Sequence, residues 1–257
     1  MNILAIGDIV GNKGCEFLRD RLPSLKKLKE IDIVIANGEN SADGNGITKK
    51  SADYLFKSGV DVITTGNHAF RRHEIYSMFE ENDALIRPAN FPKYTTPGKG
   101  YSIIDTVKAQ ICVINLMGVV YLESLNCPFT TADSIINKFK DIPIKIVDFH
   151  AEATAEKRAL GFYLDGRVSA VFGTHTHVPT SDETILPKGT GYITDVGMTG
   201  AINSVLGVIP SCSIKKMKNK LPVKFEFSKE PQKMDSILFN IDEISGQTVN
   251  IERLTIT

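Results

Sequence analysis

The sequence lacks an excess of either charge, because its 257 residues contain 30 basic and 30 acidic side chains. A protein that follows a polyanion over a long surface needs a clear basic excess, so we expect no extended nucleic-acid surface. No apolar run approaches the ~18 residues that a membrane helix requires. The first residues, MNILAIGDIVG, lack the basic region of a signal peptide. These absences predict a cytoplasmic protein that does not enter a membrane.

Several common motifs are also absent. The four cysteines are scattered without a Cys-x-x-Cys pair, which argues against a disulfide framework and predicts thiols in a reducing compartment. Gly7, Gly11 and Gly14 do not have the spacing of a dinucleotide-binding loop, and no Gly-Lys-Ser/Thr of a P-loop follows them. No serine lies in a Gly-x-Ser-x-Gly sequence, which excludes the commonest α/β-hydrolase nucleophile.

Short apolar segments rich in valine and isoleucine alternate with longer amphipathic segments in the first part of the chain. Six of the short segments predict strands buried on both faces: Asn2–Gly7, Asp32–Ala36, Asp61–Thr65, Ile111–Leu116, Ile144–Phe149 and Val168–Gly173. Five of the longer ones predict helices: Cys15–Leu28, Lys49–Ser58, His73–Glu81, Thr131–Lys140 and Ala153–Leu164. Thr48 is the expected N-cap of the second helix, and Gly59 is expected to end it. This alternation predicts an α/β fold with right-handed crossovers.

The pattern changes after Val168, where glycine, serine and proline separate shorter runs. Three runs predict strands: Pro222–Phe227, Ser236–Asp242 and Thr248–Thr257. A change in the parity of apolar residues along the last run predicts a β-bulge near Glu252–Arg253. Two segments are expected to be irregular, either as functional covers or as ordinary surface connections: Arg87–Gly100 and Gly197–Leu221. Without a linker or a repeat, we expect one domain spanning residues 1–257.

Polar side chains follow five of the predicted strands, in the sequences IGDIVG, ANGENSA, TTGNHAF, VDFHAEA and FGTHTHV. In open α/β sheets ligands bind outside the carboxyl ends of the strands, so we expect these side chains to meet at one rim. A single histidine after a strand is usually a hydrogen-bonded residue, but five such sequences together predict a metal site. Glycine precedes the polar residue in four of them, which suits a sharply turning backbone: Gly7, Gly38, Gly66 and Gly173.

The ligand types narrow the choice of metal. Carboxylate oxygen, amide oxygen and imidazole nitrogen without a thiolate suit iron, manganese or zinc, whereas structural zinc would more often use cysteine. The candidate ligands are more than one ion needs: Asp8, Glu39, Asn40, Asn67, His150, His175 and His177. Two metals ~3.5–4 Å apart, bridged by a carboxylate, are the arrangement that activates a water for phosphoryl displacement.

The order GD, GEN, GNH, a lone histidine and GTHTH resembles the calcineurin-like metallophosphoesterases, which carry a two-metal site on an α-β-β-α sandwich. The sequence is most similar to the YmdB-type bacterial 2′,3′-cyclic nucleotide phosphodiesterases, through IGDIVG, NGEN, GNH, RPANFP, DFHAEAT, GTHTHV and ITDVGMTG. The resemblance extends from Asn2 to about Phe227. Val10 stands where the wider superfamily has a histidine, and Glu39 where a bridging aspartate is common. YmdB-type proteins share both departures. The resemblance therefore does not extend to the substrates of the wider superfamily.

This resemblance implies two sets of ligands that share Glu39. The first metal would be bound by Asp8, Glu39, Asn40 and His177, and the second by Glu39, Asn67, His150 and His175. The family metal is usually iron, although manganese fits the same ligands. His68 would be the proton donor. Because Val10 cannot bind a metal, we expect Asn40 to take its place and the first metal to be held more weakly.

The implied activity is the opening of a small-molecule substrate, a 2′,3′-cyclic nucleotide, to the monophosphate by a metal-activated hydroxide. We also expect a homo-oligomer. Three alternatives stay open: a phosphomonoesterase, a nuclease acting on RNA, and a regulatory protein with little turnover. A regulatory protein would not need the complete ligand set together with His68.

Other polar residues have less distinctive positions. We expect His73 to lie on the surface of a helix, and Asp148 to be a structural residue on the side of its strand opposite His150. Asp195 either orients a ligating imidazole or caps a turn. The basic run is expected to be a solvated helix face rather than a device that attracts phosphate: Lys215, Lys216, Lys218 and Lys220.

Overall fold

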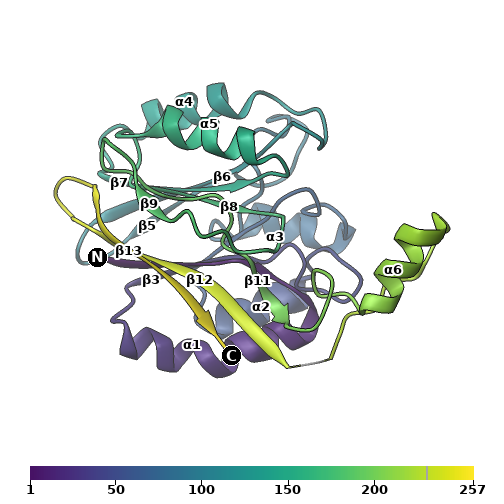
Figure 1. Cartoon of the computed structure of the whole chain (residues 1–257). Helices are drawn as coiled ribbons and strands as arrows, with labels where there is room; N and C mark the ends of the chain where they lie inside the picture. Colours follow the sequence, from purple (N-terminus) through teal and green to yellow (C-terminus); the bar gives the residue numbers. More distant parts are fainter. Residues whose placement is uncertain (230) are drawn as a thin grey trace.

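The computed structural model describes residues 1–229 and 231–257, which form a mixed α/β fold with two β-sheets. The sheets lie face to face, with α1 and α2 outside one sheet and α4 and α5 outside the other (Figure 1). The helices are α1 (Gly11–Leu28), α2 (Lys49–Lys57), α3 (Tyr76–Glu81), α4 (Pro128–Lys138), α5 (Thr154–Leu164) and α6 (Pro210–Asn219), and the 3-10 helix η1 (His73–Ile75) precedes α3. No helix among the described residues is both long and apolar enough to cross a bilayer.

The first sheet joins the two ends of the chain. Its strands, in spatial order, are β2 (Asp8–Ile9), β11 (Met198–Ala201), β12 (Gln232–Ile241), β1 (Asn2–Ile6), β3 (Ile33–Asn37) and β4 (Val62–Thr64), and β13 (Thr248–Ile256) also pairs with β12. Strand β1 is parallel to β3 and antiparallel to β12, with Leu4 opposite both Val34 and Leu238. The amino-terminal strand is therefore held in the middle of the sheet by the carboxyl-terminal hairpin.

The second sheet comes from the middle of the chain. In spatial order it contains β5 (Tyr101–Asp105), β6 (Gln110–Met117), β7 (Ile144–His150), β8 (Ala170–Thr174), β10 (Gly191–Ile193) and β9 (Thr184–Ile185). The four inner strands are parallel, and the two edge strands are antiparallel to their neighbours. The carboxyl ends of β7 and β8 therefore lie side by side.

Alternation along β1 shows how the layers are packed. Ile3 and Ala5 belong to the apolar cluster between the two sheets, whereas Leu4 and Ile6 belong to the cluster under α1 and α2. Successive strand side chains point to opposite faces, so a continuous apolar run is what a strand covered on both faces requires. A third cluster, which includes Leu160, lies between the second sheet and its helices.

All six strands and four of the five helices predicted from the first part of the chain are present, with ends shifted by at most four residues, and the helix predicted over His73–Glu81 is divided into η1 and α3. The largest shift is at α1, which begins at Gly11. The capping prediction for α2 is confirmed, because Thr48 accepts a hydrogen bond from the backbone N–H of Ser51 and Gly59 adopts a φ of 101°. The four cysteines are free thiols, as expected.

Three predictions for the last third are wrong. Residues 222–227 form no strand, because only Phe227 makes an isolated bridge, to Val208. The segment expected to be irregular from Gly197 contains β11 and α6. The register shift in β13 lies opposite Asn240 and Ile241 rather than near residues 252–253. Apolar side chains on both faces of β13 pack against the core, Ile251 on the cluster between the sheets and Leu254 and Ile256 on the cluster under α1 and α2. The change of parity therefore marks two covered faces and not a bulge.

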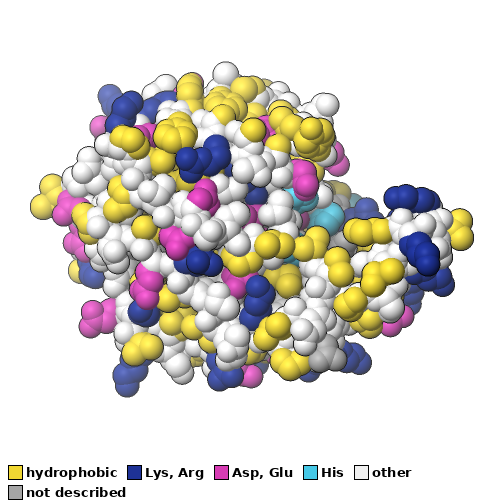
Figure 2. All heavy atoms as spheres, viewed as in Figure 1, with side chains coloured by type: hydrophobic (Ala, Val, Ile, Leu, Met, Phe, Trp, Pro, Cys, Tyr) yellow, Lys and Arg dark blue, Asp and Glu magenta, His cyan; other side chains and the backbone are white. Residues whose placement is uncertain are grey.

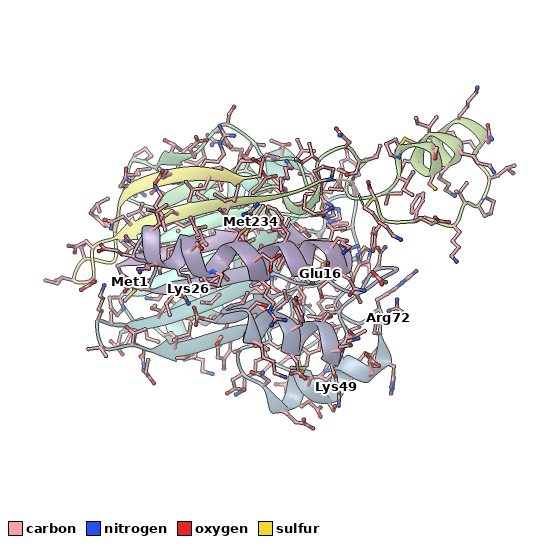
Figure 3. All side chains as sticks on the ribbon, turned by 90° about the horizontal axis from the view of Figure 1, so that it is seen from below. Met1, Glu16, Lys26, Lys49, Arg72 and Met234 are labelled. Carbon is pink, nitrogen blue, oxygen red and sulfur yellow. The ribbon has the colours of Figure 1, made fainter. Side chains whose placement is uncertain are left out.

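Residues 202–229, which we call the arm, extend away from the sheets. Figures 1 and 3 show α6 projecting from the body in two views at right angles. The side chains of the basic run on α6 are exposed, which confirms the expected solvated face: Lys215, Lys216, Lys218 and Lys220.

The glycines that precede the polar strand ends allow close backbone approach. A Cβ at Gly173 would overlap the carbonyl oxygen of Thr194, and one at Gly7 would overlap that of Gly197. Neither Gly7 nor Gly173 has a positive φ, so the sharp turn inferred from the sequence is not the reason for glycine here. At Gly38 the nearest atom is instead a side-chain methyl of Ile63, at 2.8 Å.

We expect Gly173→Ala to lower the free energy of unfolding by about 2 kcal/mol or more, because overpacking against fixed backbone typically costs ~1–3 kcal/mol. The matched variant is Gly38→Ala, where a flexible side chain can move, and its loss is expected to be smaller. Urea denaturation of both variants measures the difference. Equal stabilities would contradict the close-approach explanation.

Candidate metal centre

The eight predicted site residues come together where strand ends of the two sheets meet. The first sheet supplies Asp8, Glu39, Asn40, Asn67 and His68, and the second sheet supplies His150, His175 and His177. Figure 2 shows histidine side chains at the surface between the body and the arm. The rim expected from the sequence is therefore built by two sheets rather than by one.

Three candidate ligand atoms converge on Nε2 of His150. This nitrogen lies 3.1 Å from Oε1 of Glu39, 3.0 Å from Oδ1 of Asn67 and 3.0 Å from Nδ1 of His175. A single imidazole nitrogen carries one hydrogen or one lone pair and cannot satisfy three neighbours. Glu39, His150 and His175 form a cluster able to hold a metal ion.

The outer nitrogens of both histidines lie beside oxygen atoms to which they can donate. Nδ1 of His150 lies 3.0 Å from Oγ1 of Thr174, which itself donates to Asp148 at 2.7 Å. Nε2 of His175 lies 3.0 Å from a carboxylate oxygen of Glu152. With these nitrogens protonated, the lone pairs of the other two point at the shared space, which is the usual arrangement of metal-binding histidines.

A second, looser group lies beside the first. Oδ1 of Asp8 is 3.6 Å from Nε2 of His177, and Nδ2 of Asn40 is 3.5 Å and 3.4 Å from these two atoms. Oδ1 of Asn40 instead accepts a hydrogen bond from Nδ1 of His68, at 2.9 Å. Because the two ends of an amide are assigned from their neighbours, turning it would point the oxygen at Asp8 and His177.

Two buried polar atoms of the centre have no hydrogen-bond partner among the described residues, namely Oε1 of Glu39 and Nδ1 of His177. The other carboxylate oxygen of Glu39 accepts from the backbone N–H of His68 at 2.9 Å. Although Oε1 lies 3.1 Å from Nε2 of His150, a buried carboxylate oxygen without a hydrogen bond is costly, and a cation removes that cost. The donor set thus fits a metal ion of the borderline type.

Burial and opposite charges act against each other in the centre. Burial disfavours charge on His150, but Glu39, with Asp8 and Asp148, raises its pKa to about 9. Burial followed by the charge of His150 lowers the pKa of His175 to about 4. Burial also opposes the charge of Glu39, yet the two neighbouring histidines hold its pKa below the usual value. A metal ion bound here would compete with the proton on His150.

Asp148 lies on the same face of β7 as His150, so its expected position on the opposite side is wrong. Residues two apart in a strand share a face. Its carboxylate accepts hydrogen bonds from Thr64 at 2.5 Å and Thr174 at 2.7 Å, and burial raises its pKa to about 7 despite the nearby His150. Asp148 thereby connects the two sheets beneath the centre.

Asp195 caps a turn rather than contacting an imidazole. Its carboxylate accepts from the backbone N–H groups of Thr176 at 3.2 Å and Gly197 at 2.9 Å, and pairs with the buried Lys157 at 2.6 Å. Thr176 is the residue between the two histidines of GTHTH, so this turn fixes their separation.

Three contributors were not identified from the sequence: Asn37, Glu152 and Thr174. Each lies within two residues of an identified ligand in ANGEN, HAEA or GTHTH, and this proximity is the signal that would have found them. Oδ1 of Asn37 accepts from the backbone N–H of Glu39 at 3.2 Å, which orients the loop that carries the carboxylate.

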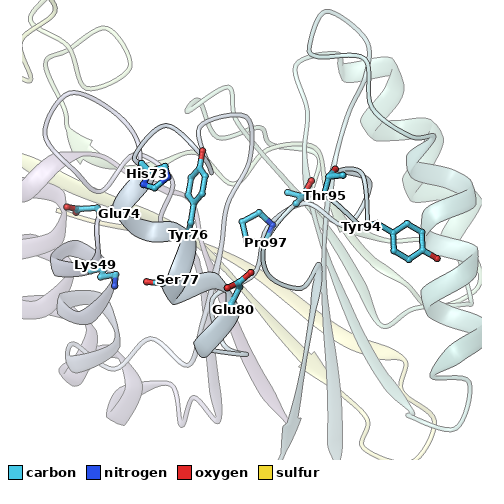
Figure 4. A pocket seen from close by; sticks show the side chains of 10 residues that line it. Lys49, His73, Glu74, Tyr76, Ser77, Glu80, Tyr94, Thr95 and Pro97 are labelled. Atoms are coloured by element: carbon cyan, nitrogen blue, oxygen red, sulfur yellow. The ribbon is translucent and has the colours of Figure 1, made fainter.

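His73 lies outside the centre, as expected. It begins η1 and its ring packs against Tyr76 at 4.7 Å. Figure 4 shows it in a separate cavity with Lys49, Glu74 and Glu80. Charges of both signs line this cavity, and it contains none of the predicted ligands.

An opening of about 290 Å³ leads to the centre. Its polar wall includes Glu39, His68 and His175, and its apolar wall comes largely from the arm, through Leu206, Val208, Phe225 and Phe227. The arm thus places aromatic side chains opposite the candidate ligands.

Comparison with known proteins agrees with this geometry. A 2′,3′-cyclic-nucleotide 2′-phosphodiesterase of Bacillus subtilis (strain 168) is 46% identical over 257 residues, which cover 100% of this chain and 97% of that protein. The crystal structure of a phosphatase from Mycoplasma pneumoniae matches with a TM-score of 0.94 and 34% identity, covering 100% of this chain and 93% of the other. The NAD nucleotidase of Haemophilus influenzae, 14% identical, shares the fold with a TM-score of 0.62 over 99% of this chain and 55% of its own.

The model of one protein family, described as YmdB-like protein, matches residues 4–254. The match spans both sheets and every candidate ligand. The chain therefore belongs to the YmdB-like protein family.

Proposed function

We propose that the chain is a metal-dependent phosphodiesterase that opens 2′,3′-cyclic nucleotides to nucleoside monophosphates. The observation that carries the proposal is the convergence of Glu39, Asn67 and His175 on one nitrogen of His150, within an opening that has an apolar wall. The full-length similarity to a phosphodiesterase of that specificity supports the substrate class. We further propose that the two sheets and their covering helices are the metallophosphoesterase sandwich.

Two metal ions are proposed, iron or manganese, with Glu39 shared between them. One ion would be bound by Glu39 with Asn67, His150 and His175. The other would be bound by Glu39 with the looser group, Asp8, Asn40 and His177. When bound, such ions supply a hydroxide at neutral pH and neutralise charge on the phosphate. The buried carboxylates hold the ions, and Glu152 and Thr174 keep the imidazoles in the tautomers that ligation needs.

His68 is proposed as the general acid. Its side chain is 28% exposed and lines the opening, so it reaches both substrate and solvent. Nδ1 lies 2.9 Å from the side-chain amide of Asn40, which fixes the ring. With the amide turned so that its oxygen faces Asp8 and His177, Nδ2 donates to Nδ1 of His68, and the hydrogen on Nε2 is left for the departing ribose oxygen. The aromatic side chains of Phe225 and Phe227 are proposed to contact the nucleobase.

The activity is tested by the turnover of 2′,3′-cyclic, 3′,5′-cyclic and monoester substrates by the same purified protein. We expect the 2′,3′-cyclic nucleotides to have the highest kcat/KM. A preference for the monoester, or for RNA strands over free nucleotides, would favour one of the alternative activities instead.

Protein purified without chelator is expected to contain close to two transition metals per chain by elemental analysis. Because ligation requires a neutral His150, the metals should be lost to a chelator more readily as the pH falls below 9. A content near zero even after reconstitution with iron or manganese would contradict the proposed centre.

His68→Ala is expected to reduce kcat by ~10²–10⁴-fold, the usual contribution of general acid catalysis, while metal content is retained. The loss should shrink for an aryl phosphodiester, whose leaving group needs less protonation. His73→Ala, which changes a histidine outside the centre, is the control. Equal losses on both substrates would argue against the acid role.

Asn40→Ala is expected to remove only the metal ion of the looser group. That ion is held more weakly, because an amide binds such ions more weakly than an imidazole, and the variant takes away one of its ligands. Asn40→Asp restores an oxygen donor and should recover occupancy. Anomalous diffraction identifies the ion that is lost. If both ions stay at full occupancy in Asn40→Ala, water rather than Asn40 completes that ligand shell.

A further inference from the structure

Another cavity, of about 590 Å³, lies between β5, α4 and the irregular segment that contains RPANFP. None of the candidate metal ligands lines it. Of the residues that the structure describes, four cationic side chains and no carboxylate line it: Arg87, Lys93, Lys99 and Lys138. A small-molecule site of this volume is of ordinary size, and its charge is of one sign.

Arg87 is the unusual member of this group. Its side chain is only 4% exposed, and Nε has no hydrogen-bond partner among the described residues. Its one side-chain hydrogen bond there joins Nη1 to the carbonyl oxygen of Pro88, at 2.9 Å. Burial lowers the pKa of Arg87, which reflects the cost of a desolvated cation. An anion in the cavity would offset that cost.

The backbone around Arg87 is held by hydrogen bonds, so the position of this residue in the cavity wall is set before any ligand arrives. The N–H of Arg87 donates to the carbonyl oxygen of Lys99 at 3.0 Å, and that of Ala89 donates to Asn115 at 2.8 Å. The side chain of Asn90 accepts from the N–H of Met117 at 2.9 Å and donates to its carbonyl at 2.8 Å. These bonds attach the RPAN part of the motif to the second sheet.

The surrounding side chains suit an organic anion. Lys99 is already paired with Asp83 at 2.7 Å, whereas Lys138 donates to the hydroxyl of Tyr101 at 2.6 Å and has no carboxylate partner within residues 1–229 and 231–257. Thr130 and Thr131, in the first turn of α4, also line the cavity, and their hydroxyls donate to the carbonyl oxygen of Cys127 at 3.2 Å and 2.9 Å. The rings of Phe91 and Tyr101 provide apolar surface for a part of the ligand that is not charged.

We propose that this cavity is a second ligand site, separate from the metal centre, that binds a phosphomonoester of nucleotide size. The planar guanidinium of Arg87 would donate to the phosphate oxygens, with Lys138 adding charge at the rim. The volume exceeds that of a bare phosphate ion, so the organic part would lie against Tyr101 and Phe91. The proposal does not depend on the activity of the metal centre.

Calorimetric titration of the full chain with adenosine 5′-monophosphate tests it, with adenosine as the uncharged probe. We expect the natural protein to bind two molecules of adenosine 5′-monophosphate per chain, one at the metal centre and one in the cavity beside Arg87. The control variant Arg21→Met, which removes an exposed arginine of α1, should bind the same number. Arg87→Met should retain only one site and should unfold at the same or a higher temperature, because it removes an uncompensated buried charge.

Lys138→Met keeps the test decisive if Arg87→Met does not fold, since Lys138 is exposed. It should weaken the second site about tenfold or more and leave the first unchanged. Equal binding by adenosine, unchanged stoichiometry in Arg87→Met, or unchanged affinity in Lys138→Met would each overturn the proposal. Loss of both sites in a metal-free protein would assign all binding to the metal centre and overturn it as well.

Discussion

The candidate site depends on one buried contact between the sheets, in which Oε1 of Glu39 lies 3.1 Å from Nε2 of His150. Glu39 follows a strand of the first sheet and His150 ends a strand of the second, and both are fully buried. A buried carboxylate and a buried imidazole are stable only with compensating charge or hydrogen bonds. The sheets must therefore pack in one relative position, which the hydroxyl groups of Thr64 and Thr174 on Asp148 reinforce.

The ligating residues could be predicted because their chemistry is local to the sequence. A polar residue directly after an apolar strand has few structural reasons to be there, so GEN, GNH and GTHTH stood out. Side-chain orientation was less predictable. Asp148 was assigned to the wrong face, and Glu152 was overlooked because an exposed glutamate carries no signal until its partner, His175, is known.

The fold was predictable where strands are covered on both faces and unpredictable where they are not. The apolar runs that begin at Ile33 and Ile144 are stable only when both faces of the strand are buried. By contrast, β11 is four residues long and contains Gly200, and its identity depends on pairing with β12, which lies more than thirty residues later. The arm is a similar case: the sequence around Phe225 and Phe227 predicts a strand, yet these two side chains line the opening to the candidate ligands.

Glu39 is proposed to be shared by two metal ions held between the sheets. Elemental analysis of Glu39→Ala, purified beside Asn67→Ala, tests this most directly. Loss of a shared ligand should empty both positions, whereas loss of Asn67 should affect only the ion at His150 and His175. Retention of one full equivalent of metal by Glu39→Ala would contradict the shared carboxylate and with it the proposed two-metal centre.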